Sequence, residues 1–144
     1  MVLSAAVLCL ALNVYHEARG EMLAGQLAVA LVTMNRARDS GRHICHEVFA
    51  PRQFSWTNTR AERVGNTYRL KISGVPTERR AWEMAKVIAR TVLNGEVGDI
   101  TNGSKFYHST SVRPIWRHGL EKTILVGNHQ FYREKSFMRE GVMQ

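Results

Sequence analysis

Two glutamates near the start of the chain are the residues best placed for acid–base chemistry. Glu17 and Glu21 stand in the segment Tyr15-His16-Glu17-Ala18-Arg19-Gly20-Glu21, directly after the almost uncharged residues 1–14. Burial at the end of an apolar helix raises the pKa of a carboxyl group, and an acid still protonated near neutral pH can act as a general acid. We therefore predict Glu17 as the catalytic acid, against the alternative of a helix-end carboxylate paired with Arg19 or a surface lysine. For Glu21 we expect a supporting role, as a salt bridge or a helix cap.

Clusters that mix aromatic and polar side chains follow later in the chain. They are Gln53-Phe54-Ser55-Trp56, Phe106-Tyr107-His108-Ser109-Thr110, Pro114-Ile115-Trp116 and His129-Gln130-Phe131-Tyr132. Sugars stack on aromatic faces while polar side chains bind their hydroxyl and amide groups, although any one cluster also fits core packing with a satisfied polar tip. Together the clusters favour an extended glycan groove. The expected substrate-side residues are Glu21, Gln53, Ser55, Trp56, Tyr107, His108, His129 and Tyr132.

Several of these segments resemble one known family. The glutamate segment is followed by Gly25-Gln26-Leu27-Ala28-Val29-Ala30 and Asn35-Arg36, and later by Phe49-Ala50-Pro51-Arg52-Gln53-Phe54-Ser55-Trp56, Phe106-Tyr107-His108 and Gly127-Asn128-His129-Gln130-Phe131-Tyr132. In this order they are similar to the cell wall hydrolase family of spore cortex-lytic enzymes and bacteriophage endolysins. The resemblance covers roughly residues 10–132. It implies a lysozyme-like α+β fold, cleavage of peptidoglycan glycan strands, and a catalytic role for the first glutamate of the motif, Glu17.

The predicted reaction follows from the number of carboxylates with supporting context. A hydrolysing glycosidase generally needs two, and only Glu17 stands out. A single essential glutamate favours a lytic transglycosylase that cleaves the bond between N-acetylmuramic acid and N-acetylglucosamine without metal or other cofactor. A hydrolytic muramidase acting on the same bond stays open. Ser55, Tyr107, His108 and His129 are candidates to orient the sugar or stabilise oxocarbenium-like charge.

Two further functions belong to other classes. A zinc-dependent N-acetylmuramoyl-L-alanine amidase would use histidine ligands, and His16, His108 and His129 are prominent. They lack the close helical spacing of a zinc-binding histidine pair. A nucleic-acid-binding module would concentrate its basic residues in a stripe, whereas those of this chain are scattered. We expect neither a metal site nor a nucleic-acid partner.

Composition predicts one globular catalytic domain, residues 1–144, with a polar tail from about residue 133 to 144. The formal net charge of +8 predicts attraction to a polyanion. With peptidoglycan as substrate, this charge fits contact with an anionic envelope surface. Spore enzymes of the family usually carry a separate peptidoglycan-binding domain, for which this chain has no room. We expect a compact, monomeric, phage-type lysin.

The ends and cysteines of the chain bear on where it acts. Residues 1–12 are expected to form a packed helix and not a signal peptide. A phage protein without such a signal would be made in the host cytoplasm and released by a holin to the cell wall or periplasm. Cys9 lies in an apolar stripe, which predicts a reduced core thiol. A Cys9–Cys45 bridge is the alternative if the protein works outside the cytoplasm.

Hydrophobic periodicity predicts helices first and a few strands last. Helices are expected at residues 4–18, 22–38, 43–48 and 77–93, and strands at 106–108, 123–126 and 130–132. Ser4 and Thr77 are expected helix caps, and Gly127-Asn128 the turn of a hairpin. Residues 53–57 read as a loop and residues 58–76 as an irregular excursion. This order predicts an α+β protein, mainly helical, with a small antiparallel sheet in its C-terminal third.

Overall fold

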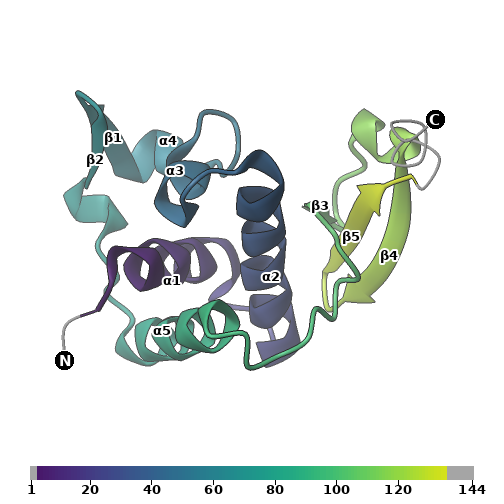
Figure 1. The fold of residues 1–144 in the computed structure, drawn as a ribbon, viewed down its shortest axis with the longest axis horizontal. Helices are drawn as coiled ribbons and strands as arrows, with labels where there is room; N and C mark the ends of the chain where they lie inside the picture. The colour runs from purple at the N-terminus through teal and green to yellow at the C-terminus, as the bar shows by residue number, and fades with distance from the viewer. Residues whose placement is uncertain (1–2, 136–144) are drawn as a thin grey trace.

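The protein is described by a computed structural model that covers residues 3–135, and its helices come before its main sheet (Figure 1). The α-helices are α1 (Ala5–Ala18), α2 (Leu23–Ser40), α3 (Ile44–Phe49), α4 (Trp56–Arg60) and α5 (Arg79–Leu93). The strands are β1 (Ala61–Val64), β2 (Thr67–Leu70), β3 (Phe106–Ser109), β4 (Leu120–Val126) and β5 (His129–Glu134). The predicted α+β fold, mainly helical with a small antiparallel sheet in the C-terminal third, is confirmed.

Helix α1 forms the centre of the helical region. Ser4 caps it as predicted, because its hydroxyl accepts a hydrogen bond from the Val7 amide at 3.2 Å. Leu10 and Val14 are fully buried in a core shared with α5, whose inner face presents a helical stripe of Ala85, Ile88, Ala89 and Val92. The apolar N-terminal segment is therefore a packed helix that delivers its last turn, with Glu17, to one end of the core.

Helix α2 lies between the other helices and the three-stranded sheet (Figure 1). Its Ala30 and Leu31 join the helical core, while Ala28 and Val32 pack with Val126 and Phe131 of the sheet in a second, smaller core. The small alanine side chains allow close approach on both sides of the helix. Helix α2 thus fixes the sheet relative to α1.

The three-stranded sheet has the order β3-β5-β4, with antiparallel pairs throughout. The predicted turn is confirmed, with Gly127 at a φ of 54° between β4 and β5. All the strands are longer than the segments expected from the sequence. In the register, Tyr107 of β3 lies opposite Phe131 of β5, so the buried Phe131 supports the strand that carries Tyr107.

The segment between α3 and α5 was predicted wrongly as a loop and an irregular excursion. It forms α4, then a hairpin of β1 and β2, then a short 3-10 helix, η1 (Ile72–Gly74). Both strands carry mostly polar, exposed residues, so the alternation of apolar and polar residues that indicates a strand is missing. Only tertiary contacts distinguish such a hairpin from a loop.

The start of α5 also differs from the prediction. The helix begins at Arg79, and Thr77 does not cap it. Instead, the Thr77 and Glu78 amides both donate to the hydroxyl of the buried Tyr15, each at 3.1 Å. A tertiary hydrogen bond therefore replaces the local cap, which sequence periodicity cannot anticipate.

The structure also changes two of the sequence predictions, one about Cys9 and one about the C-terminal tail. Cys9 is not a reduced thiol, because a disulfide joins it to Cys45 and ties α1 to α3. Of the expected polar tail, Arg133 and Glu134 belong to strand β5, and residues 136–144 lie outside the described residues. Within residues 3–135, no helix has the length and hydrophobicity needed to cross a membrane.

Candidate active site

Glu17 lies in the last turn of α1 and faces a cavity of about 290 Å³. Burial raises the pKa of its carboxyl group, an effect that a hydrogen bond from Tyr107 and the charge of Arg36 reduce but do not cancel. The group therefore holds its proton to a higher pH than an exposed glutamate. The cavity is lined by Glu17, Arg36, Arg52, Gln53, Phe54, Ser55, Asn58 and Tyr107.

Tyr107 comes from β3 and donates its hydroxyl hydrogen to Oε1 of Glu17. Burial raises the pKa of Tyr107 well above its usual value, and the neighbouring Glu17 charge raises it further. The phenol is thus a neutral donor at any pH at which the protein would work. Because it occupies Oε1, the proton of the Glu17 acid belongs on Oε2, the oxygen left for a substrate.

Arg36 of α2 joins three segments around the cavity. Its Nε donates to the Lys105 carbonyl at 2.5 Å, and its Nη1 donates to the Gln53 carbonyl at 3.4 Å. The guanidinium also lies over the rings of Phe54, at 4.9 Å, and Phe106, at 5.8 Å. Arg36 therefore places a fixed positive charge near Glu17 and holds the 53–56 segment against the start of β3.

A second cavity, of about 500 Å³, continues the first one. The two share Arg36, Arg52, Gln53 and Tyr107 as lining residues. The second adds Phe106, Trp116, Gly119 and Leu120. The two cavities form one cleft, which we call the Glu17 cleft. Among the described residues that line it, Glu17 is the one carboxylate.

Buried polar contacts hold the C-terminal end of α1, which carries Glu17, in place. Asn13 accepts a hydrogen bond from Trp56 Nε1 at 2.8 Å and donates to Thr33 Oγ1 at 3.0 Å, which joins α1 to α4 and α2. His16, next to Glu17, stacks on Trp56 and lies 2.8 Å from the Gly74 carbonyl. A Cβ at Gly74 would come within 2.3 Å of the Arg60 carbonyl oxygen, so this close approach needs glycine.

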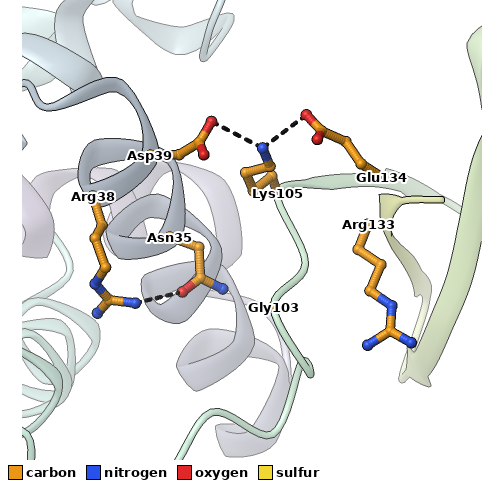
Figure 2. A pocket seen from close by; sticks show the side chains of 7 residues that line it. All are labelled: Asn35, Arg38, Asp39, Gly103, Lys105, Arg133 and Glu134. Atoms are coloured by element: carbon orange, nitrogen blue, oxygen red, sulfur yellow. Dashed lines mark hydrogen bonds and ion pairs between the residues drawn. The ribbon is translucent and has the colours of Figure 1, made fainter. Parts of the chain in front are cut away.

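A bridge of charges holds the start of β3 against the end of α2 and the end of β5. Figure 2 shows the Nζ atom of Lys105 between Asp39, at the end of α2, and Glu134, at the end of β5, at 2.9 and 2.8 Å. Burial opposes the charge of Lys105, but the two carboxylates outweigh it and raise its pKa. Lys105 directly precedes β3, so this Asp39–Lys105–Glu134 bridge positions the strand whose Tyr107 meets Glu17. The three residues of this bridge also line a separate cavity of about 450 Å³.

Glu21 lies beyond the end of α1 and does not line the Glu17 cleft. Its Oε1 is 2.8 Å from Nδ1 of His129, at the start of β5, and its backbone carbonyl accepts from Gln26 at 3.0 Å. The partner expected for Glu21 is therefore His129, and the pair is a salt bridge when His129 is protonated. The pair connects the α1–α2 junction to the sheet.

A model of the family described as Cell Wall Hydrolase matches residues 20–132. The chain belongs to the cell wall hydrolase family. It is therefore an enzyme that acts on the bacterial cell wall, and the sequence resemblance is confirmed. The matched range begins just after Glu17, so the role of Glu17 depends on the geometry of the site.

Two solved structures share the fold of this cell wall hydrolase. One is the catalytic domain of the germination-specific lytic transglycosylase SleB from Bacillus anthracis, with a TM-score of 0.69 and 24% identity over 92% of this chain and 97% of that chain. The other is the catalytic domain of the Bacillus cereus SleB protein, with a TM-score of 0.66 and 26% identity over 89% of each chain. A search of curated proteins finds no significant match.

The cell wall hydrolase fold brings four of the predicted site residues together. Glu17, Gln53, Ser55 and Tyr107 line the same cavity. They come from α1, from the segment before α4, and from β3. Segments far apart in sequence therefore converge on Glu17.

The other five predicted residues line neither cavity of the Glu17 cleft: Glu21, Trp56, His108, His129 and Tyr132. Trp56 and Tyr132 are only 6% and 1% exposed, so most of each ring packs inside the protein and is not open to a substrate. Tyr132 and His108 instead contact each other, with His108 Nε2 2.7 Å from the Tyr132 hydroxyl. His108 Nδ1 lies 2.7 Å from the Ser109 carbonyl and donates to it, because a carbonyl oxygen can only accept. A local mixture of aromatic and polar residues in the sequence does not show whether a residue lines the cleft or packs behind its wall.

Sequence reasoning named no individual site role for several residues that line the Glu17 cleft. They are Arg36, Arg52, Phe54, Asn58, Phe106, Trp116, Gly119 and Leu120. Arg36 and Arg52 stood within the motifs that carry the family resemblance, which was an available signal. Trp116 stood in a cluster that was noted but given no site residue.

The three prominent histidines do not converge on one point. His16 lies against the Gly74 carbonyl, His108 against Tyr132, and His129 against Glu21. Within residues 3–135, no group of three or more His, Cys, Asp or Glu side chains is placed to hold a metal ion.

Proposed function

We propose that this chain cleaves the bond between N-acetylmuramic acid and N-acetylglucosamine in peptidoglycan as a lytic transglycosylase, with Glu17 as the one catalytic carboxylate. The observation that carries the proposal is a partly buried carboxyl group whose pKa is raised, in a cleft lined by no other described carboxylate. Similarity to a domain named as a lytic transglycosylase agrees with this choice.

The proposed reaction uses Glu17 twice. First, the proton on Glu17 Oε2 passes to the glycosidic oxygen, and the bond from that oxygen to muramyl C1 breaks. The Glu17 carboxylate then takes the proton of the muramyl 6-hydroxyl, whose oxygen bonds to C1 and closes a 1,6-anhydro ring. Glu17 regains its proton, and no water is consumed. Tyr107 and Arg36 lie where they can stabilise the carboxylate between the two steps.

A hydrolytic muramidase would place a second carboxyl group about 5–9.5 Å from the acid, to act as nucleophile or base. Glu21, the nearest acid in sequence, is engaged by His129 and does not line the cleft. The alternative amidase reaction would need converging metal ligands, whereas the three histidines have separate partners. Both features support the transglycosylase route.

The deciding experiment is product analysis on purified peptidoglycan with wild type, Glu17→Gln and Glu21→Gln. We expect Glu17→Gln to lose at least about a hundredfold in rate, the usual contribution of general acid–base catalysis. Glu21→Gln should retain most of the rate. Mass spectrometry should find 1,6-anhydromuramyl ends, lighter by one water than reducing ends. Reducing ends would indicate a muramidase, free stem peptides would indicate an amidase, and full activity of Glu17→Gln would refute the catalytic assignment.

The place of action forms part of the proposal. Disulfides persist in oxidising compartments and are rare in the cytoplasm, so the Cys9–Cys45 bridge supports action in the envelope. We propose that the protein works there as a monomer on glycan strands. Its net charge of +8 favours contact with the anionic envelope, and release from the cytoplasm by a holin is the proposed route.

A further inference from the structure

Trp116 lies at the end of the Glu17 cleft farther from the catalytic acid. It belongs to a short 3-10 helix, η2 (Ile115–Gly119), and lines the larger cavity with Phe106 and Tyr107. Its side chain is 45% exposed, although burial of a tryptophan normally stabilises a fold considerably. An exposed indole in a cleft wall is a typical feature of a binding surface.

Contacts on its inner side hold the indole in place. Its ring centroid lies 5.6 Å from that of Tyr132 and 5.7 Å from that of His108, at interplanar angles of 79° and 73°. Phe106 lies 6.1 Å away. Since Tyr132 and His108 are themselves hydrogen-bonded to each other, Trp116 rests on a fixed base. A flat ring that is already ordered loses little entropy when it binds a ligand.

Arg52 supplies charge to the same part of the cleft. It lines both cavities, its residue is exposed, and no hydrogen bond or ion pair joins its side chain to another residue of the described part of the chain. Its φ of 66° is in the left-handed region, which is uncommon for a residue other than glycine. The larger cavity is lined by Arg36 and Arg52 and by no described acid. Arg36 is already engaged by two carbonyls, so Arg52 is the guanidinium available to a ligand.

We propose that the Trp116 end of the Glu17 cleft is a saccharide subsite, in which Trp116 stacks on a sugar ring and Arg52 binds a carboxylate of the same glycan strand. This inference rests on the proposed function, because it extends the substrate beyond the bond that Glu17 cleaves. Peptidoglycan offers two sources of the carboxylate, the lactyl group of the muramyl sugar and the stem peptide. The subsite would give the enzyme a preference for polymer over short fragments.

The test measures binding in the Glu17→Gln background, where a ligand is not consumed. The probes are chitin oligosaccharides, which carry no carboxylate, peptide-free peptidoglycan strands with free lactyl groups, and strands that keep their stem peptides. We expect Trp116→Ala to weaken the binding of all three about tenfold, the loss typical of an aromatic anchor. Titration with chitin oligosaccharides should change the tryptophan fluorescence, and Trp116→Ala should abolish that change.

Arg52→Ala should leave binding of chitin oligosaccharides unchanged and weaken that of carboxylate-bearing strands about fivefold. Weaker binding of the peptide-free strands would identify the lactyl group, and weaker binding of the peptide-bearing strands alone would identify the stem peptide. Equal loss on all three probes, or none, would overturn the role of Arg52.

Two variants serve as controls for these measurements. Ile115→Ala removes an 87% exposed side chain from the same 3-10 helix without touching the cleft, and Arg80→Ala removes an exposed positive charge from α5. Both should bind all probes like the parent. Trp116→Phe, which keeps a ring, should recover most of the affinity and covers the case in which Trp116→Ala folds poorly. Unchanged binding by folded Trp116→Ala would refute the subsite, whereas full lytic activity of Glu17→Gln would refute only the catalytic assignment.

Discussion

The hydroxyl of Tyr107 in β3 donates a hydrogen bond to the carboxyl of Glu17 in α1, across a sequence separation of 90 residues. This contact joins the helical region to the sheet at the point where we propose the chemistry to occur. It also sets the protonation of the acid, because a donor favours the charged form of a carboxyl group and so lowers its pKa. Burial acts in the opposite direction and dominates.

Replacing Tyr107 by Phe should therefore change both the rate and its pH dependence. Without the donor, the pKa of Glu17 rises further, so the high-pH limb of the kcat/KM profile should move to higher pH. The rate at the optimum should fall about tenfold or more, because a hydrogen bond to a charged group is worth about 1.5–3 kcal/mol. Turbidity assays on purified peptidoglycan across the pH range measure both effects. A loss of rate with an unmoved limb would show that Tyr107 only supports the fold.

Replacing Glu17 by Gln should stabilise the fold near neutral pH. The pKa of Glu17 is raised in the folded state, so its contribution to stability is present below the ordinary pKa of glutamate and is lost as pH rises through the folded value. Glutamine cannot ionise and avoids this loss. The Tm of Glu17→Gln should exceed that of wild type near pH 7, and the two should converge toward about pH 4.

Glu62→Gln is the control for the Tm measurement on Glu17→Gln, because its expected change in Tm has the opposite sign. The hydrogen bond and charge of Arg69 lower the pKa of Glu62, so its contribution exists above the ordinary glutamate pKa and disappears as pH falls. Any change in Tm at Glu62→Gln should be a small decrease near neutral pH. An increase there, or a Glu17→Gln difference that does not vary with pH, would contradict the assigned directions.

Local sequence signals were sufficient for much of the fold. The helical spacing of Ala85, Ile88, Ala89 and Val92 and the Gly127 turn lie within short stretches, so periodicity and turn chemistry could identify α5 and the last hairpin. The β1–β2 hairpin could not be identified, because its strands are exposed and lack alternation. Its position depends on contacts with distant residues, such as that between Tyr68 and Phe49.

The distinction between local sequence signals and tertiary contacts applies to the candidate site as well. Glu17 could be nominated from its place after an apolar run, together with the distant aromatic–polar clusters and the family resemblance, and its catalytic role stays a proposal. Tyr107 could be nominated from its aromatic–polar neighbourhood, although its contact with Glu17 could not be foreseen. Trp56 and Tyr132 shared that kind of neighbourhood and are buried. Whether an aromatic residue lines a cleft or supports it depends on tertiary packing, which a local pattern does not contain.

Removing the disulfide should lower stability with little effect on activity at moderate temperature. The Cys9–Cys45 bridge spans 36 residues, and cross-linking a loop of this length is worth about 4 kcal/mol in the chain-entropy model. Thermal or urea unfolding of a Cys9→Ser, Cys45→Ser double variant should show most of that loss, and reduction of wild type with dithiothreitol should reproduce it. The reductant should leave the double variant unchanged, and an effect there would indicate a cause other than the disulfide.

Replacing Lys105 by Met tests whether its bridge to Asp39 and Glu134 positions β3 for activity or only stabilises the fold. The side chain is 15% exposed and bridges Asp39 to Glu134, so its loss leaves both acids able to turn to solvent. The expected stability cost is therefore only about 1 kcal/mol. The rate should fall more than this cost explains, because β3 loses the bridge that holds Tyr107 toward Glu17.

Lys86→Met is the matched control for this separation. Lys86 is similarly exposed, at 18%, and pairs with Glu83 on α5, away from the cleft. It should lose a comparable amount of stability in urea unfolding and keep the wild-type rate on peptidoglycan. If Lys105→Met and Lys86→Met retain the same activity, the Asp39–Lys105–Glu134 bridge stabilises the fold without positioning Tyr107. A lower rate confined to Lys105→Met, with the high-pH limb displaced as in Tyr107→Phe, would show that the bridge acts through the Tyr107–Glu17 hydrogen bond.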